Sequence, residues 1–138
     1  MVASGGYRIH VPDYTRALIR RIVENAEVWW CTTWRHRAND EIATFLGIGP
    51  LPFVDDGSAI RSVDWKAAAA RPLIDRALAE RREVYWIEDF YGEPLVGEVP
   101  SAVRFIDTAP DGGADAVLTP EMIPSVLLEG TSMSQEVV

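Results

Sequence analysis

The sequence predicts an α/β domain built on a mostly parallel sheet. Short runs rich in β-branched and aromatic residues, at 27–31, 84–88 and 103–107, alternate with segments in which apolar residues recur at helical spacing. Strands that alternate with helices usually form a parallel sheet with helices on both faces. The 138 residues suit a single domain, which we place at 1–130, followed by a loose tail over 131–138.

The first half of the chain begins with residues 7–11, whose alternating pattern predicts a short strand or flap. A helix is expected from Pro12 onward, with Asp13 as its N-cap, because apolar residues then recur every three or four positions. The other elements of this half are a buried strand at 27–31, a helix at 36–46 that ends at Gly47, and a short strand at 52–54.

The second half opens with a long helix from Trp65 to about Arg82, in which Pro72 predicts a kink or two abutting helices. Thr119 as N-cap and Pro120 at the first helical position predict a last helix through about Leu128. Between these helices we expect strands at 84–88 and 103–107, a short helix near 93–98 and a turn at 111–113.

Composition narrows the possible functions. The net charge of −8 argues against a broad nucleic-acid surface, because no basic face is available to displace counterions from phosphates. A single cysteine, Cys31, excludes a disulfide framework and multi-cysteine zinc sites, and inside a strand it reads as a small buried hydrophobe. No apolar run approaches the length of a membrane span and no signal-peptide pattern begins the chain, so the expected location is the cytoplasm.

Polar residues at the ends of the predicted strands are the main candidates for a site, because ligands bind beyond the carboxyl ends of parallel strands. Thr32 and Thr33 follow the strand at 27–31, where a hydroxyl and free backbone N–H groups can hold a phosphate oxygen. The alternative is an ordinary strand end or helix cap. Trp34 and Trp65 flank these polar positions and are interpreted as pocket walls, or else as core residues.

An acidic pair and a single lysine complete the candidate set. Glu88 and Asp89 end the strand at 84–88 and offer the oxygen ligands that Mg²⁺ prefers, although a capping acid beside a solvated one is the plainer interpretation. Lys66 is the only lysine of the chain and stands at a predicted helix start, where the helix dipole disfavours a cation. Such a local conflict suggests a function, here a point charge for a phosphate, against the alternative of a solvated lysine.

Taken in order, a threonine at one strand end, a lysine at a helix start and an acidic pair at the next strand end resemble the haloacid dehalogenase (HAD) superfamily. The likeness is closest to the small HAD domains of Swiss Army Knife RNA-repair proteins and their bacterial and phage relatives, and it covers about residues 7–128. The segments that carry it are AEVWWCTTWRHRAND (26–40), LGIGPLPFV (46–54), DWK (64–66) and VYWIEDF (84–90).

The resemblance implies a Rossmann-like three-layer sandwich and a Mg²⁺-dependent phosphohydrolase that works through an aspartyl-phosphate. By position, Thr32 matches the phosphate-binding threonine, Lys66 the lysine that steadies phosphate and nucleophile charge, and Glu88 with Asp89 the acidic motif that anchors Mg²⁺. Glu88 stands where the relatives usually have aspartate, so its oxygens are displaced by about one C–C bond. The length leaves no room for a large cap, since only a flap at about 5–11 and a loop at 55–64 are available.

The first motif of that family, a buried strand ending in Asp-x-Asp-Gly, has no counterpart in the sequence. The DDG at 55–57 comes after the threonine motif, in the wrong order, and neither Asp13 nor Asp55 is placed to act as nucleophile. One hypothesis is that the natural polypeptide begins upstream of Met1 and is a HAD phosphohydrolase whose first central strand is missing here.

The other hypothesis is a degenerate HAD-like binding or regulatory module without catalysis. Residues 7–11, a partner chain or a dimer contact would then replace the missing strand. As it stands, we expect the chain to lack nucleophilic phosphoryl transfer. The expected ligand is a small phosphorylated molecule or the terminal phosphate of a nucleic acid.

Overall fold

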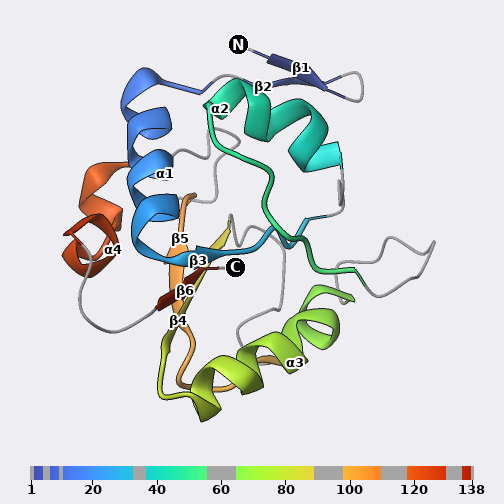
Figure 1. The fold of residues 1–138 in the computed structure, drawn as a ribbon, viewed down its shortest axis with the longest axis vertical. Helices are drawn as coiled ribbons and strands as arrows, with labels where there is room; N and C mark the ends of the chain where they lie inside the picture. The colour runs from blue at the N-terminus through green and yellow to red at the C-terminus, as the bar shows by residue number, and fades with distance from the viewer. Residues whose placement is uncertain are drawn as a thin grey trace.

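The computed structural model describes residues 2–4, 7–9, 11–32, 37–55, 65–88, 98–109, 118–129 and 135–137 (Figure 1). Helices and strands alternate through most of this part of the chain. In order, the elements are β1 (Val2–Ser4), β2 (Tyr7–Ile9), α1 (Asp13–Asn25), β3 (Glu27–Val28), the π-helix η1 (Ala38–Ala43), α2 (Thr44–Leu46), α3 (Trp65–Ala79), β4 (Glu83–Glu88), β5 (Arg104–Asp107), the 3₁₀-helix η3 (Pro120–Met122), α4 (Ser125–Glu129) and β6 (Gln135–Val137).

Four of the described strands form one sheet in the order β3-β6-β4-β5, and all three pairings are parallel. The predicted α/β class with a parallel sheet is therefore confirmed. Beside β3, Trp30 makes a further parallel bridge to Phe53, which is where the short strand at 52–54 was expected. The strand predicted at 27–31 is regular only over Glu27–Val28, whereas those predicted at 84–88 and 103–107 appear almost at their expected bounds.

The C-terminal segment corrects one expectation. A loose tail was predicted over 131–138, but Gln135–Val137 form β6 in the interior of the sheet, paired with β3 on one side and β4 on the other. Backbone N–H and C=O groups in a sheet interior need partners, and β6 supplies them to both neighbours. Three residues are too few for their alternation to signal a strand.

The N-terminal strand also lies elsewhere than the sequence suggested. Tyr7–Ile9 form β2, as predicted, but β2 pairs antiparallel with β1 in a separate hairpin. Residues 7–9 are therefore not part of the main sheet. The position between β3 and β4 in that sheet is taken by β6.

The effect of a proline on a helix differs between two positions of the chain. Pro72 was expected to kink or divide the long helix, yet α3 is one helix over Trp65–Ala79. Pro72 has no backbone N–H to donate to the carbonyl of Ala68, one turn earlier in the helix. Both residues are exposed, so solvent can form a hydrogen bond with that carbonyl. By contrast, Pro124 separates η3 from α4, so the single helix predicted from Pro120 is two short ones.

The two expected N-caps have different outcomes. Asp13 is the first residue of α1 rather than its cap, and it forms an ion pair with Arg16 one turn later. Thr119 does occupy the N-cap position, before Pro120 of η3, but its side chain makes no capping hydrogen bond. At the other end of a helix the expectation is confirmed, because Gly47 follows α2 with a φ of 72°, the left-handed conformation that favours glycine.

Two predictions fall on residues that the structure does not describe. These are the short helix near 93–98, of which only residue 98 is described, and the turn at 111–113.

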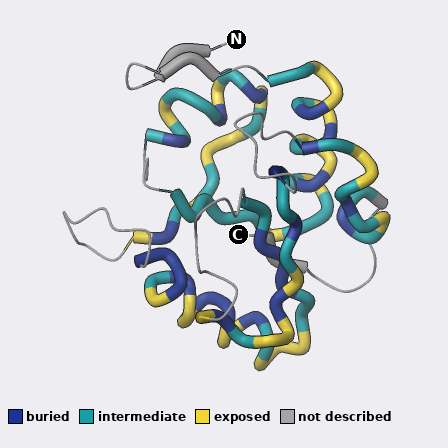
Figure 2. The backbone as a smooth tube through the Cα atoms, turned by 180° about the vertical axis from the view of Figure 1, so that it is seen from behind, coloured by how far each residue is buried: buried dark blue, intermediate teal, exposed yellow. Residues whose placement is uncertain are grey.

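The core is divided between the two faces of the sheet. Val84 and Trp86 of β4 pack with α3, while Tyr85 of the same strand packs with α1 and α4, so alternate residues of one strand reach opposite layers. Figure 1 shows α3 on one side of the sheet and α1 with α4 on the other. In Figure 2, buried and exposed residues alternate along α3, as expected for a helix with one face on a sheet.

Tyr85 gives the fold a measurable dependence on alkaline pH. Its side chain is 1% exposed, and burial, followed by the hydrogen bond that its hydroxyl donates to Glu83 at 2.7 Å, raises the pKa of Tyr85 to about 12. An unfolded tyrosine has a pKa of about 10. The contribution of neutral Tyr85 is therefore complete below pH 10 and is lost as the pH rises through about 12.

We expect the free energy of unfolding to fall by about 1–2 kcal/mol between pH 9.5 and 11.5 in the native chain, and by distinctly less in Tyr85→Phe. Urea unfolding at a series of pH values measures this. Tyr14→Phe is the matched control, because Tyr14 is 48% exposed. An identical alkaline loss in Tyr85→Phe and the native chain would contradict the assignment.

Candidate functional site

A cavity of about 340 Å³ lies beside the carboxyl ends of β3 and β4. Its walls are largely apolar and come from α1, from the segment that follows β3, and from the end of β4. Polar groups are confined to a few residues, chiefly Thr32, Lys66 and Glu88. The remaining lining residues are Ile19, Ile22, Val23, Val28, Trp29, Trp30, Cys31, Ile48, Leu51, Ile87 and Leu118.

Lys66 and Glu88 form a buried ion pair at this cavity. Lys66 is the second residue of α3 and Glu88 the last of β4, and each side chain is only 10% exposed. The Lys66 ammonium donates to Oε1 of Glu88, while the indole Nε1 of Trp86 donates to Oε2 at 2.9 Å. Both carboxylate oxygens of Glu88 therefore have a donor, which fixes its orientation. Two residues that the sequence singled out separately are thus brought together.

The alternation of β4 explains why Glu88 faces α3. Trp86 packs in the α3 layer, and a residue two positions later on a strand points to the same face. Lys66 lies in the first turn of α3, where the helix dipole disfavours a cation. The negative charge of the Glu88 carboxylate compensates the unfavourable interaction of the Lys66 cation with the helix dipole. The local conflict in the sequence is therefore resolved by a contact in the fold.

Asp107 is a neighbour that the sequence interpretation missed. It pairs in register with Glu88 across β4 and β5, and therefore shares its face of the sheet. Its Oδ1 accepts a hydrogen bond at 2.8 Å from the backbone N–H of Ala109. The signal was available, because Asp107 ends the third predicted strand just as Glu88 ends the second.

The other predicted site residues have mixed outcomes. Thr32 lines the cavity, as expected of a residue that follows the first strand, and Cys31 is half-buried beside it. Trp65 is buried in the core cluster with α3 and is not among the residues that line this cavity, which agrees with its alternative interpretation as a core residue. Trp29 and Trp30 form a wall of the cavity instead. Thr33, Trp34 and Asp89 lie outside the described residues.

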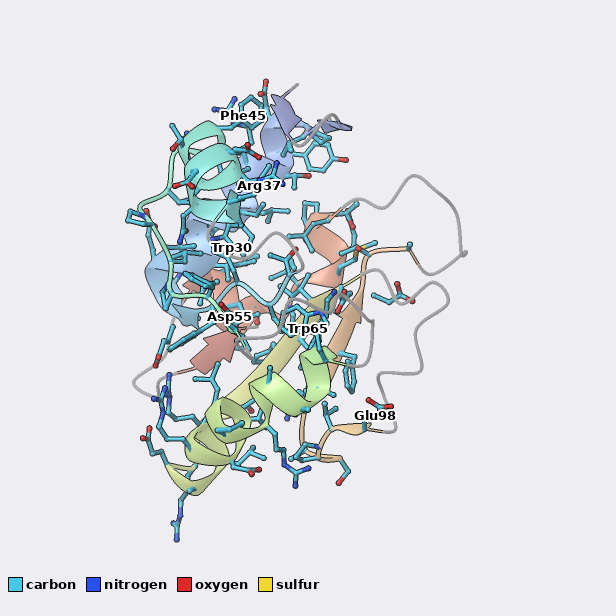
Figure 3. All side chains as sticks on the ribbon, turned by 90° about the vertical axis from the view of Figure 1, so that its right-hand side faces the viewer. Trp30, Arg37, Phe45, Asp55, Trp65 and Glu98 are labelled. Atoms are coloured by element: carbon cyan, nitrogen blue, oxygen red, sulfur yellow. The ribbon has the colours of Figure 1, made fainter. Side chains whose placement is uncertain are left out.

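Asn39 organises the wall that contains Trp30. Its Oδ1 accepts hydrogen bonds from the Trp30 indole at 2.9 Å and from the Leu51 backbone N–H at 2.8 Å, while its Nδ2 donates to the Leu51 carbonyl. One side chain in η1 thereby ties the segment after β3 to the segment before Phe53. Figure 3 shows Trp30 in the middle of the molecule, between η1–α2 on one side and α3 on the other, with Trp65 at the start of α3.

Two arginines of α1 hold the end of α2 against this wall. Arg16 donates to the carbonyl of Phe45 at 3.1 Å, and Arg20 donates to that of Leu46 at 2.9 Å. Cations at a helix C-terminus also interact favourably with its dipole. A Cβ on Gly47 would lie 2.4 Å from the Arg20 guanidinium, so this position combines a left-handed backbone with close packing.

Glu27 fastens the short strand β3 to the rest of the sheet. It accepts hydrogen bonds from the Trp29 indole at 2.9 Å, from Arg82 at 2.7 Å and from Arg76 at 3.3 Å. The Trp29 bond, and then Arg82 and Arg76, hold the pKa of Glu27 below its ordinary value against the opposing effect of partial burial. The carboxylate of Glu27 is therefore the favoured form at neutral pH, and it orients the Trp29 wall of the cavity.

The chemical capacity of the site follows from the Lys66–Glu88 pair. The pair is neutral as a unit, so an anion must draw Lys66 away from Glu88, and a cation must draw Glu88 away from Lys66. The carboxylates of Glu88 and Asp107 on adjoining strands are donors of the kind that Mg²⁺ prefers. Within the described residues, His, Cys, Asp and Glu form no group of three or more that could hold a metal ion.

Comparisons with known proteins give no assignment. No protein-family model, curated protein or solved structure matches the chain. Over the described residues, no helix combines the length and the apolar character needed to cross a membrane.

Proposed function

We propose that the chain is a HAD-like domain that binds Mg²⁺ and a small phosphorylated ligand together, at Lys66 and Glu88, in the cytoplasm. The observation that carries this proposal is the buried pair itself, at the polar part of an otherwise apolar cavity. A buried ion pair is weak support for stability alone, because apolar residues of similar size often serve as well. A site that must exchange its internal partners for a ligand explains why the charges are there.

The two ligands would each take one member of the pair. Lys66, a compact point charge, would turn to a phosphate oxygen, and Thr32, which also lines the cavity, offers a hydroxyl donor. Glu88 would hold the cation, with Asp107 on the adjoining strand as a further carboxylate. When bound, Mg²⁺ supplies charge neutralisation of the phosphate. The apolar walls suit an organic body attached to that phosphate.

Cooperativity distinguishes this arrangement from adventitious binding. Either ligand alone leaves one buried charge without its counter-ion, which is costly, whereas both together leave every charge compensated. We therefore expect Mg²⁺ alone and inorganic phosphate alone to leave the melting temperature nearly unchanged. Together, at about 100 times their joint dissociation constant, they should raise Tm by about 8 °C. Differential scanning fluorimetry measures all three conditions.

A matched pair of variants localises the effect. Lys66→Met should abolish the joint rise in Tm relative to its own ligand-free value, whereas Arg71→Met, which removes an exposed cation of the same helix, should preserve it. A joint rise that survives in Lys66→Met would contradict the assignment, as would full shifts from either ligand alone. Because Trp86 donates to Glu88, its fluorescence gives a second readout of the same exchange.

Hydrolysis is a separate question. The sequence carries no Asp-x-Asp-Gly before the threonine motif, and neither Asp13 nor Asp55 is placed to serve as nucleophile. We therefore expect no release of nitrophenol from an aryl phosphate with Mg²⁺ that depends on Lys66. Turnover by the purified chain that is lost in Lys66→Ala would show that a nucleophile is present after all.

A further inference from the structure

The cavity walls away from the ion pair determine which organic body a bound phosphate can carry. Aliphatic side chains and two tryptophans make up most of these walls. Besides Thr32, Lys66 and Glu88, the lining side chains that carry a polar atom are the two indoles and the thiol of Cys31, which is a weak hydrogen-bonding group. A ligand body therefore depends on the indole N–H groups or on the backbone for its hydrogen bonds.

Both indole N–H groups already have acceptors inside the protein. The Nε1 of Trp29 donates to Glu27 at 2.9 Å, and the Nε1 of Trp30 donates to Asn39 at 2.9 Å. An indole has a single N–H and no acceptor. The two tryptophans thus contribute apolar ring surface to the cavity, and their polar edges are used to hold the wall together.

Several backbone groups of the walls are engaged in the same way. The N–H of Trp30 donates to the carbonyl of Pro52 at 2.9 Å, and its carbonyl accepts from the N–H of Val54 at 2.7 Å. The N–H and the carbonyl of Leu51 both bond to the side chain of Asn39. The lining residues of α1 donate their N–H groups within the helix. Their side chains are left to define the character of these walls, which is apolar.

Such walls discriminate between two kinds of phosphate ester. A sugar hydroxyl or a nucleobase buried there would lose its hydrogen bonds to water without gaining equivalent partners, whereas a hydrocarbon is stabilised by the same transfer. We propose that the ligand of this site is a phosphate monoester of a hydrocarbon, aryl or alkyl, and not a sugar phosphate or the end of a nucleic acid. This inference rests on the proposed joint binding of Mg²⁺ and phosphate at Lys66 and Glu88.

The volume limits the size of the hydrocarbon. An apolar protein cavity of about 150 Å³ holds one benzene molecule. The present cavity, at about 340 Å³, has room for a phosphate group and a single ring, or an alkyl chain of similar size. Phenyl phosphate is therefore the matched probe, and ribose 5-phosphate is its polar counterpart because its body also contains one small ring.

The test titrates the full chain by calorimetry at one fixed Mg²⁺ concentration. We expect phenyl phosphate to bind at least about tenfold more tightly than inorganic phosphate, because even one methylene group in an apolar pocket changes binding by about that factor. Ribose 5-phosphate and adenosine monophosphate should bind no more tightly than inorganic phosphate. Either of them binding as tightly as phenyl phosphate would overturn the inference.

The outcomes separate this inference from the proposed function. If inorganic phosphate and Mg²⁺ together raise Tm but phenyl phosphate binds no more tightly than inorganic phosphate, the hydrocarbon assignment is wrong and the joint site stands. If inorganic phosphate and Mg²⁺ together leave Tm unchanged, the proposed function fails and this inference fails with it.

A pair of variants localises the hydrocarbon. Ile48 is half-buried and lines the cavity, so Ile48→Phe should lower the affinity for phenyl phosphate by about tenfold and leave that for inorganic phosphate unchanged. Ile42→Phe is the control, because Ile42 is also half-buried but is not among the lining residues. Equal losses of phenyl phosphate affinity in the two variants, or none in Ile48→Phe, would contradict the proposal. The comparison among ligands on the native chain stands even where a variant fails to fold.

Discussion

Replacing Lys66 by methionine is expected to lower the free energy of unfolding by about 3–5 kcal/mol, because it leaves the carboxylate of Glu88 buried without its counter-ion. Only 10% of the Glu88 side chain is exposed, so water cannot replace the ammonium effectively. The remaining donor, the Trp86 indole, is neutral. Urea unfolding at neutral pH, followed by circular dichroism, measures the change.

The double variant Lys66→Met with Glu88→Leu should recover most of that loss, because apolar residues of similar size then fill the space without a buried charge. Arg71→Met is the surface control: Arg71 and Asp75 form an ion pair with both side chains more than half exposed, and such pairs contribute about 0–1 kcal/mol. If Lys66→Met costs no more than Arg71→Met, the pair is solvated in solution and the site described above does not exist.

Ile74→Ala is expected to have the second large effect, a loss of about 2–5 kcal/mol. Ile74 is 0% exposed and packs from α3 into the cluster that contains Val84 and Trp86 of β4. Truncation removes three carbon atoms and leaves a cavity between helix and sheet. This tests the packing of α3 as one continuous helix, since a break at Pro72 would release the half that carries Ile74.

The comparison is with Asp75→Ala on the same helical turn, whose side chain is 56% exposed and whose ion pair is a surface one. That change should shift stability by at most about 1 kcal/mol. The m-value should be the same for both variants, because the surface exposed on unfolding is nearly unchanged. A loss below 1 kcal/mol for Ile74→Ala would show that α3 is loosely packed on the sheet.

Much of the fold was readable from local pattern. β4 and β5 were predicted nearly at their bounds because each is a dense run of β-branched and aromatic residues, buried and framed by polar segments. The end of α2 was equally clear, since Gly47 is the residue type that the left-handed backbone there favours. These features depend on near neighbours in the sequence, which is the range over which patterns are informative.

The misses depend on contacts between distant segments. The local sequence of Gln135–Val137 does not indicate that these residues lie between β3 and β4. Their place in the sheet depends on pairing with these two distant strands. Pro72 stays within one helix because its carbonyl partner faces solvent, which requires knowing the buried face of α3. Which interpretation of Trp65 applies also depends on the fold: its side chain packs in the core cluster, whereas Lys66, the next residue of α3, lines the cavity.

For the site, the rule that ligands bind beyond strand ends led to Glu88 and Thr32, which both line the cavity. Applied to the third strand, the same rule leads to Asp107, which pairs in register with Glu88. The sequence order of Lys66 and Glu88 did not establish their contact. That contact follows from two facts of the fold: α3 begins at the carboxyl edge of the sheet, and Glu88 faces the α3 layer. The position of Trp30 in the cavity wall depends on Asn39, which accepts hydrogen bonds from the Trp30 indole and from the Leu51 backbone N–H. These contacts join segments that are separate in the sequence, so no local pattern predicts them.

The interior placement of β6 has a consequence for how the chain folds. β3 and β6 lie far apart in the sequence, at Glu27–Val28 and Gln135–Val137, so their pairing has one of the longest loops to close in the molecule. During synthesis, helix α1, the hairpin and the α3–β4–β5 unit can all form before β6 leaves the ribosome. The sheet is therefore completed last, and until then the edges of β3 and β4 stand open to pairing with other chains. Folding at high protein concentration is the condition under which this chain is most exposed to aggregation.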